Sequence, residues 1–595
     1  MPLRSCPQTF VAGQRRRDRH PGGPAVHDLI IRNATVVDGT GASARAGDVA
    51  ITNGRIDAVT APGAIAPGAK NAAEEIDAGG LVAAPGFIDV HTHYDCQLFW
   101  DPTASPSSWH GVTSVVMGNC GFTIAPCLPE HRETVMQLLL YVEGMPIETL
   151  RAGIEWSWEE FPDYLGALER QGVGPNVAAF VGMSAVRFRV MGKAAVERPA
   201  TGDEITRMQH VVRDAMRAGA VGWSTSLSPT HFFGDGTPAP TRVSDDAELD
   251  AMAAVLREFG HGLIELAPQS LLGTPDDKLR ELDLFARLAR VSGRTVTFAP
   301  LHESPFFPGA AQQILDASRA HLADGASVVP QVGCRPLELR FDFARPAFGL
   351  ENNGFWKPIM HRTLDERRAM FASPDFRAKL RGYDANMKAL LTPSWERMFL
   401  RVPAHPENAR WVDVSVADMA RQTGKHPVDA FLDVSLADDL AGQWGVEVLN
   451  ADEEKVGALI RSEGTVLALS DAGAHVDTLC DQGFTSYLLG HWVRERGLLG
   501  LEEAVRLITS RPAEVYGLHD RGTLAAGKAA DVVLFDPKTI RMRPTEVVAD
   551  LPGGQKRLLQ RAEGIPLVLV NGRRAVADGK PTGTLAGQVL RGGRA

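Results

Sequence analysis

Two histidines separated by a single residue, His91 and His93, are the side chains whose spacing most clearly allows metal chemistry. They end the apolar run 87–91, which predicts a buried β-strand. Side chains two positions apart on a strand point to the same side, so both imidazoles can reach one ion. Cys120 lies just beyond a second apolar run, 112–117, between glycines that let the backbone approach an ion closely. A lone cysteine is more often an inert core residue, so its position alone does not decide its role.

Apolar runs of strand length recur along the middle of the chain, separated by stretches with apolar residues at three- and four-residue spacing. The former predict strands of a parallel sheet, and the latter predict helices packed on it. The eight predicted strands cover residues 87–91, 112–117, 176–181, 220–225, 262–266, 295–298, 326–332 and 465–470. The predicted helices include residues 202–217, 245–259, 275–291 and 310–323. This alternation predicts an α/β fold, a (β/α)₈ TIM-type barrel, whose sites are built at the carboxyl ends of the strands.

Both ends of the chain carry short β-rich runs, and Asn53-Gly54 between two such runs is a strong hairpin signal. We therefore expect one small β-sandwich domain, formed by residues 28–84 and 520–595, beside a barrel over residues 85–519.

Two segments break this organisation. Residues 335–420 lie between the seventh and eighth predicted strands and are rich in prolines and aromatic side chains. They are too apolar for a linker, so we expect an inserted lid or subdomain over the barrel mouth that shapes the pocket. Residues 1–27 carry arginines, prolines and glycines without an apolar run, and we expect a disordered extension there.

Length and composition exclude several classes of protein. A chain of 595 residues is too long for a small binding module, and no stretch approaches the roughly 18 to 20 apolar residues of a membrane helix. The net charge of −10 gives no electrostatic reason to bind nucleic acid or an anionic membrane. Six scattered cysteines are too few for a disulfide scaffold, so we expect a cytoplasmic protein. A homo-oligomer is one option that the sequence leaves open.

Five motifs lie near predicted strand ends or in the terminal β-rich region. They are Ala84-Pro85-Gly86-Phe87-Ile88-Asp89, His91-Thr92-His93-Tyr94-Asp95, Gly118-Asn119-Cys120-Gly121-Phe122, Leu469-Ser470-Asp471-Ala472-Gly473-Ala474-His475 and the run 522–531. Together they resemble the amidohydrolase superfamily, and the third and fourth resemble its N-acyl-D-amino-acid deacylase (D-aminoacylase) group. The resemblance covers the chain from about residue 28. It implies that Cys120 joins His91 and His93 as a zinc ligand, with one or two Zn²⁺ ions bound, and that Asp471 acts as general base and acid.

The predicted fifth and sixth strands depart from the D-aminoacylase pattern, in which each generally supplies a metal-binding histidine. Glu265 stands where the fifth-strand histidine is expected, and a carboxylate can also bind zinc. The alternative is a structural charge paired with a nearby Arg or Lys. His302, slightly offset from the pattern after the sixth strand, is a further candidate ligand.

Substrate-binding candidates are His475, in the loop after the catalytic aspartate, and Ser226, at the end of the fourth strand. Each could instead be a purely structural residue. D-aminoacylases usually carry an arginine in that loop, where a guanidinium can bind the amino-acid carboxylate, but residues 471–481 contain none. Together with the aromatic insertion, this absence favours a bulkier or more apolar amide.

The expected reaction is zinc-dependent hydrolysis of a small-molecule C–N amide bond other than a peptide bond. Zinc lowers the pKa of bound water from about 15.7 towards about 7, and Asp471 would accept the proton and return it to the departing amine. Three alternatives remain: a hydrolase of cyclic amides or lactones, a deaminase on the same barrel, and a barrel that has lost its ligands and serves in assembly. The fourth predicted strand offers no lysine, which argues against the dihydropyrimidinase type of two-metal site.

Overall fold

The computed structural model describes residues 27–66, 71–345, 350, 353–384 and 394–593. The extension predicted for residues 1–27 lies outside this part of the chain, except for His27, which begins β1 (His27–Val36). Within the described ranges, no helix combines the length and the apolar composition that a membrane crossing requires.

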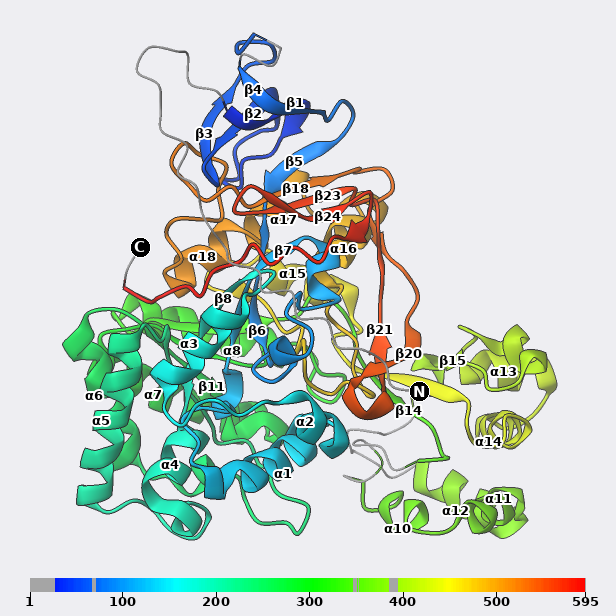
Figure 1. The fold of residues 1–595 in the computed structure, drawn as a ribbon. Coiled ribbons are helices and arrows are strands. Elements are labelled where there is room, and N and C mark those ends of the chain that lie inside the picture. Colours follow the sequence, from blue (N-terminus) through cyan, green and yellow to red (C-terminus); the bar gives the residue numbers. More distant parts are fainter. Residues whose placement is uncertain (1–26, 67–70, 346–349, 351–352, 385–393, 594–595) are drawn as a thin grey trace, which may run out of the picture.

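A barrel of parallel strands forms the centre of the molecule (Figure 1). Its strands are β6 (Phe87–Thr92), β7 (Val112–Met117), β8 (Asn176–Ala179) continued by β9 (Val181–Gly182), β10 (Gly222–Ser226), β11 (Leu263–Ala267), β12 (Val296–Phe298), β13 (Val328–Val332) and β17 (Val466–Leu467). Neighbours pair in parallel, and a bridge between Thr92 and Ala472 joins the last unit to the first. Every residue of these strands is buried, as expected where helices cover a parallel sheet. The predicted (β/α)₈ barrel is confirmed.

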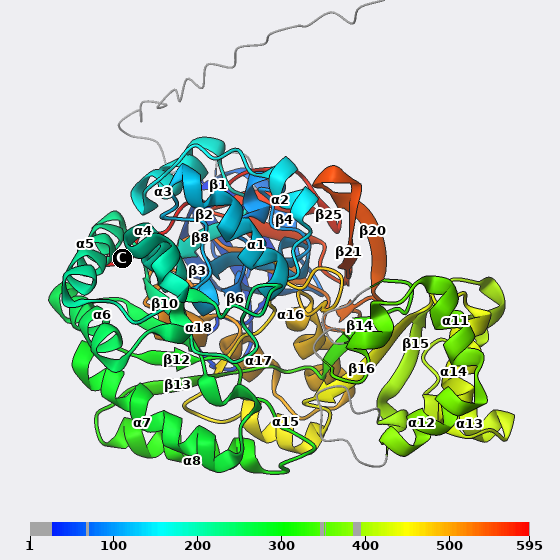
Figure 2. The same cartoon turned by 90° about the horizontal axis from the view of Figure 1, so that it is seen from below.

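Helices form a layer around the barrel (Figure 2). Four were predicted from apolar spacing: α5 (Gly202–Ala218), α6 (Asp246–Phe259), α7 (Pro275–Ser292) and α8 (Ala310–Ala323). Thr201 and Thr274 open α5 and α7 with capping boxes, which satisfy free N–H groups of the first turn. Other helices of the barrel region are α1 (Arg132–Val142), α2 (Ile147–Gly153), α3 (Phe161–Gln171), α4 (Met183–Met191), α15 (Glu453–Ile460), α16 (Phe484–Tyr487), α17 (Leu501–Leu507) and α18 (Ser510–Tyr516).

The last barrel strand, β17, is shorter than predicted. It ends at Leu467, whereas the apolar run suggested a strand to residue 470. Leu469 and Asp471 have φ angles of 71° and 44°, in the left-handed region, so the backbone leaves the extended conformation before the carboxylate.

Strands from both chain ends form one nine-stranded sheet (blue and red in Figure 1). It contains β1, β2 (Arg45–Thr52), β3 (Arg55–Thr60), β4 (Ala72–Asp77), β5 (Val82–Pro85), β18 (Val532–Phe535), β23 (Leu567–Val570), β24 (Arg573–Ala577) and β25 (Lys580–Pro581). Asn53 and Gly54, with φ angles of 51° and 74°, make the predicted two-residue hairpin turn between β2 and β3. β18 pairs with β5, so the two chain ends meet in the middle of the sheet.

Two short strand pairs lie outside this sheet. β19 (Arg541–Met542) pairs with β22 (Ala562–Glu563), and β20 (Glu546–Leu551) pairs with β21 (Gln555–Leu559). The N–H of Leu558 in β21 donates a 2.6 Å hydrogen bond to the carbonyl of Val476. The C-terminal part of the chain therefore contacts the loop that follows Asp471.

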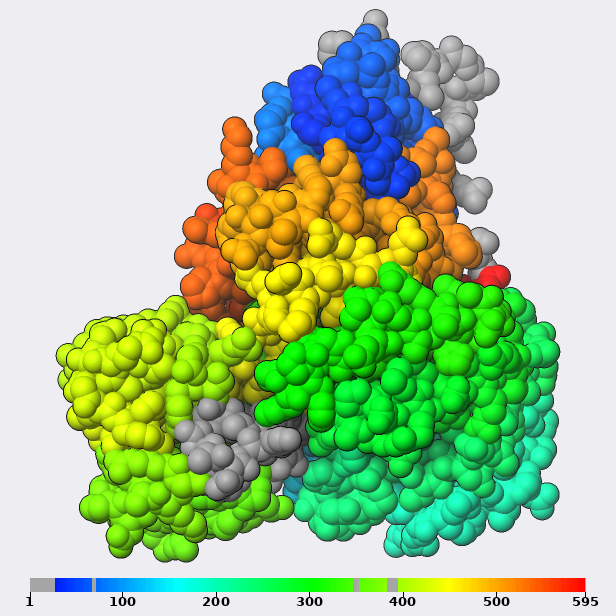
Figure 3. All heavy atoms as spheres, turned by 180° about the vertical axis from the view of Figure 1, so that it is seen from behind, coloured from blue at the N-terminus to red at the C-terminus, as the bar shows by residue number. Residues whose placement is uncertain are grey.

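The segment between β13 and β17 forms a lobe beside the barrel (green-yellow in Figures 2 and 3). It contains a three-stranded sheet of β14 (Leu337–Phe341), β15 (Met398–Val402) and β16 (Gln443–Leu449), with α10 (Lys357–Met360), α11 (Leu364–Ala372), α12 (Pro374–Asp384), α13 (Val416–Thr423) and α14 (Pro427–Ala437). β16 pairs with both other strands and lies beyond residue 420. The aromatic side chains of this segment, among them Phe343 and Trp356, pack together as its own hydrophobic core.

Candidate metal centre and active site

Two imidazoles and a thiol converge at the carboxyl ends of the first two barrel strands. Ligand atoms of His91, His93 and Cys120 all lie within 4.8 Å of one another. Their exposures are only 2%, 3% and 9%. Cys120 has a φ of 54° and Gly118 a φ of 80°, so the chain turns sharply directly after β7. The structure thus brings together the three residues on which the metal-site prediction rests.

Gln331, on β13, orients the ring of His91. The carboxamide oxygen Oε1 of Gln331 lies 2.7 Å from Nδ1 of His91, and this oxygen can only accept, so Nδ1–H donates. Nε2 of His91 then carries the lone pair, and it lies 3.6 Å from Sγ of Cys120. Outer partners that fix the tautomer in this way are typical of metal-binding histidines. Sequence analysis missed Gln331, although a polar residue inside the apolar run 326–332 was a usable signal.

Glu143, just after α1, lies beside His93 as an acidic neighbour, without a hydrogen bond to it. It is 2% exposed, and its Oε1 lies 3.4 Å from Nδ1 of His93. Burial alone would lower the pKa of His93, but the negative charges of Glu143 and Asp471 raise it to about 9. Sequence analysis also missed Glu143, whose only local signal is an acidic residue after an apolar helix.

Asp471 faces both histidines. Its Oδ1 lies 3.2 Å from Nε2 of His91 and 3.7 Å from Nε2 of His93. Burial would raise the pKa of Asp471, but a hydrogen bond with His93 and electrostatic interactions with the neighbouring histidines lower it below its ordinary value. Asp471 is therefore an ionised carboxylate in position to accept a proton.

Glu265 lies against the Cys120 turn, at 0% exposure. Its Oε2 accepts a 2.6 Å hydrogen bond from the N–H of Cys120, and its Oε1 lies 4.0 Å from Nδ1 of His91. Oε1 has no hydrogen-bond partner among the described residues. Burial raises the pKa of Glu265 to about 8. Within the part of the chain that the structure describes, Glu265 forms no ion pair with an Arg or Lys, and its role as a metal ligand stays a prediction.

The donor set of this site fits a zinc ion. Imidazole nitrogens and a thiolate are preferred zinc ligands, at about 2.0 to 2.3 Å from the metal. Burial raises the pKa of Cys120 well above its ordinary value, so a nearby cation is needed to hold its thiolate. Oε1 of Glu265, buried and unpartnered among the described residues, is a further oxygen donor beside the three ligand atoms.

The remaining predicted residues take three different positions. His302 lines the same cavity but lies outside the 4.8 Å group, and burial lowers its pKa to about 4. His475 also lines the cavity, and its N–H donates a 2.5 Å hydrogen bond to the carbonyl of Glu143. Ser226 does not line it: its hydroxyl lies 2.6 Å from Nδ1 of His231, which does. His231, the hydrogen-bond partner of Ser226, thus lines the cavity in its place, and a contact between Ser226 and substrate stays a prediction.

A cavity of about 660 Å³ opens beside the candidate ligands. The inserted segment contributes aliphatic side chains to its wall, namely Leu337, Leu339 and Leu449. The insertion therefore shapes the pocket as expected, although the aromatic side chains thought to do so mostly fill the core of the lobe.

Two basic side chains line the cavity, where the loop after Asp471 offers no arginine. Arg335 is engaged, because its Nη1 lies 3.0 Å from Oδ1 of Asp481. Lys278, on α7, forms no ion pair within the described residues, and burial lowers its pKa. Among the described residues Lys278 is therefore the basic side chain of the cavity that is left available for an anionic group.

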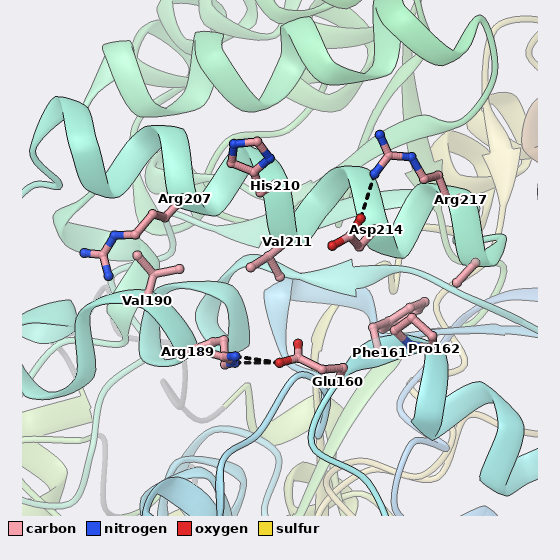
Figure 4. A pocket seen from close by; sticks show the side chains of 11 residues that line it. Glu160, Phe161, Pro162, Arg189, Val190, Arg207, His210, Val211, Asp214 and Arg217 are labelled. Atoms are coloured by element: carbon pink, nitrogen blue, oxygen red, sulfur yellow. Dashed lines mark hydrogen bonds and ion pairs between the residues drawn. The ribbon is translucent and has the colours of Figure 1, made fainter.

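A second cavity, of about 630 Å³, lies on the outside of the barrel against α3, α4 and α5 (Figure 4). Its charged side chains largely pair with one another: Arg189 with Glu160 at 2.6 Å, and Arg217 with Asp214 at 2.7 Å. It contains none of the predicted site residues, so we assign the chemistry to the inner cavity.

Comparison with known proteins agrees with this site. The model of the family described as "Amidohydrolase family" matches residues 74–576. This chain belongs to the amidohydrolase family. It is 30% identical to an N-acyl-D-glutamate deacylase of Alcaligenes xylosoxydans xylosoxydans over 582 residues, which cover 95% of this chain and 96% of that protein.

Solved structures resemble this amidohydrolase over most of its length. A D-aminoacylase crystal structure is 25% identical, with a TM-score of 0.64, and the match covers 95% of this chain and 100% of that chain. An N-acyl-D-glutamate deacylase of Bordetella bronchiseptica, complexed with zinc and a phosphonate inhibitor, is 26% identical with a TM-score of 0.61, over 95% and 100% of the two chains. The predicted resemblance to D-aminoacylases is confirmed, and the chain is a metal-dependent amide hydrolase.

The role of Gln331 can be tested by metal binding alone. Gln331→Leu removes the acceptor that fixes the tautomer of His91, and we expect its zinc affinity to fall about 10- to 100-fold. Competition with a chelator of known affinity measures this change. Gln313→Leu, on the exposed side of α8, is the matched control. Equal zinc affinity of Gln331→Leu and the control would contradict the assignment.

Proposed function

We propose that this amidohydrolase binds zinc through His91, His93 and Cys120, and hydrolyses the amide bond of an N-acyl-D-amino acid or a closely related, more apolar amide. The observation that carries the proposal is the 4.8 Å group of two imidazoles and a thiol facing the carboxylate of Asp471. Relatives named N-acyl-D-glutamate deacylase and D-aminoacylase support the substrate class. Glu265 and His302 are the candidates for completing the ligand set of one or two ions.

The residues of the cavity have distinct tasks in this reaction. When bound, zinc would polarise the substrate carbonyl and lower the pKa of a water molecule to about 7. Oδ1 of Asp471 accepts the proton that this water loses when its oxygen bonds to the carbonyl carbon. Asp471 then delivers the proton to the amide nitrogen as the C–N bond breaks, giving a carboxylic acid and an amine. Gln331 holds the imidazole of His91 in orientation throughout, and the charge of Glu143 lies beside that of His93.

The walls of the cavity favour a substrate with an apolar part. Leu272, Phe306 and Phe307 line it, although they are 60%, 38% and 37% exposed. Exposed apolar side chains gathered at a cavity mouth are typical of a binding surface. Lys278 offers a charge for one carboxylate of the substrate, in place of the arginine that the loop after Asp471 lacks.

Metal quantification together with an amide panel tests this function. We expect at least about one zinc per purified chain, and release of free amino acid from N-acetyl-D-leucine or N-acetyl-D-phenylalanine faster than from N-acetyl-D-glutamate. Lys278→Met should raise KM for the free acids by about tenfold or more and leave the corresponding carboxamides unchanged. Lys528→Met is the control, because Lys528 does not line the cavity and instead donates a hydrogen bond to the carbonyl of His519.

The same panel separates the alternatives. Ammonia released from a purine or amidine substrate without hydrolysis of acyl amino acids would point to a deaminase, and ring opening would point to a cyclic amide or lactone hydrolase. A preparation that binds no metal and hydrolyses none of these substrates would favour the assembly protein.

A further inference from the structure

Ser226 and His231 form a hydrogen-bonded pair on one wall of the cavity. The hydroxyl oxygen of Ser226 lies 2.6 Å from Nδ1 of His231, and Ser226 is fully buried at the end of β10. The N–H of Ser228 donates a 3.1 Å hydrogen bond to the same hydroxyl oxygen. His231 itself lines the cavity that also contains the candidate metal ligands. The reaction described so far uses neither residue of this pair.

The direction of the hydrogen bond between Ser226 and His231 follows from the hydrogens that each group can donate. The Ser226 hydroxyl has one hydrogen to donate, and Nδ1 of His231 is its only acceptor among the described residues. A hydrogen on Nδ1 would leave this buried hydroxyl without an acceptor, which is unfavourable. Every group is satisfied only when the hydroxyl donates to Nδ1 and the ring hydrogen resides on Nε2. Burial, with the charges of His475 and His93, lowers the pKa of His231 to about 3, which keeps the ring neutral.

The ring of His231 is fixed close to the Cys120 turn. It packs edge-on against Phe122, two residues after Cys120, with 5.0 Å between ring centroids. Its backbone carbonyl accepts hydrogen bonds from the N–H of Ala239 and from Nη1 of Arg242. Nε2 makes no hydrogen bond with any described residue. A rigid, neutral N–H donor is therefore available to a ligand in the cavity.

We propose that Nε2–H of His231 donates a hydrogen bond to the carbonyl oxygen of the amide substrate, and that Ser226 is the positioning residue that fixes its tautomer. This inference rests on the proposed function. The carbonyl oxygen gains negative charge as the water oxygen bonds to the carbon, and a donor fixed in advance stabilises that charge more than the neutral amide. His231 keeps its hydrogen throughout, since Asp471 accepts the water proton and supplies the amine proton.

The zinc-loaded enzyme and its His231 variants provide the test. His231→Phe keeps a ring against Phe122 but removes the donor, so we expect kcat to fall about 100-fold with KM changed less than about threefold. The affinity of the methylphosphonyl analogue of N-acetyl-D-leucine should fall by the same factor as kcat/KM, because it carries the charge of the tetrahedral state. His231→Gln can place an amide N–H near the position of Nε2 and should recover about tenfold of the loss.

Variants of Ser226 test its positioning role, and a variant of the distant His210 serves as the control. Ser226→Ala should lower kcat about tenfold without loss of zinc, and Ser226→Thr, which keeps the hydroxyl, should restore it. His210→Phe, in the cavity outside the barrel (Figure 4), is the matched control and should behave as wild type.

Two results would overturn the inference in distinguishable ways. If wild-type enzyme hydrolyses amides and His231→Phe keeps kcat and phosphonate affinity within about threefold, His231 is not a donor to the substrate, and the proposed function stands. If wild-type enzyme hydrolyses no amide, the proposed function itself is wrong. Phosphonate binding to the two zinc-loaded proteins would then still show whether His231 contacts a tetrahedral anion.

Discussion

Asp471→Asn should retain zinc and a folded barrel while kcat falls by about 10³-fold or more. The amide that replaces the carboxylate has the same shape but cannot accept the proton of the attacking water or return it to the amine. Because Oδ1 of Asp471 lies 3.2 Å from Nε2 of His91, the substitution changes a group that faces the candidate metal ligands without opening space. Steady-state turnover of an N-acyl amino acid, with zinc measured on the same sample, provides the readout.

Asp477→Asn is the matched control for this substitution. Asp477 belongs to the same loop, is exposed and accepts a hydrogen bond from the Thr478 hydroxyl. We expect its turnover within about twofold of wild type. Near-normal turnover of Asp471→Asn would remove Asp471 from the role of general base.

Cys120→Ala should abolish tight zinc binding and with it nearly all turnover. Its thiolate is the one sulfur ligand of the 4.8 Å group, and removing it leaves two imidazoles, too few for a stable zinc site. Metal content after dialysis and the activity regained at saturating zinc measure the effect. A chelator should likewise inactivate the wild-type enzyme, and added zinc should restore it.

Cys96→Ala provides the comparison. Cys96, like Cys120, is buried and lies close after a barrel strand, but it is not part of the cluster. Its zinc content should match wild type. Equal zinc content in Cys120→Ala would show that the thiol is a spectator.

Barrel strands could be predicted because both faces of a parallel strand are buried. The runs that became β6, β7 and β11 were therefore uninterrupted and located those strands to within about one residue. β17 was predicted too long because apolar composition does not report φ, and Leu469 and Asp471 are left-handed. The pairing of β16 with β14 in the inserted sheet could not be predicted either. β14 lies about a hundred residues earlier, and the order of apolar residues in the sequence does not show which strands pair.

His91 and His93 could be predicted because their spacing of two residues on one strand is itself a recognisable pattern. The role of Cys120 needed the resemblance to D-aminoacylases, since an isolated cysteine has no distinctive spacing. Gln331 and Glu143 were missed because their importance comes from contacts between elements far apart in sequence. The hydrogen bond between Ser226 and His231, five residues later, could not be predicted either, because it depends on the path of the loop after β10.

The seam between the first and last barrel strands has a consequence for how the protein is made. His93 donates its N–H to the carbonyl of Ala472 over 2.7 Å, and a Cβ on Gly473 would lie 2.5 Å from the carbonyl oxygen of His93. Both histidines leave the ribosome before Asp471, which follows roughly 20 to 80 seconds later at usual elongation rates. During that interval the nascent chain has the three candidate metal ligands but not the carboxylate or the seam that closes around them. The complete site therefore forms only after Asp471 and the seam residues have been synthesised.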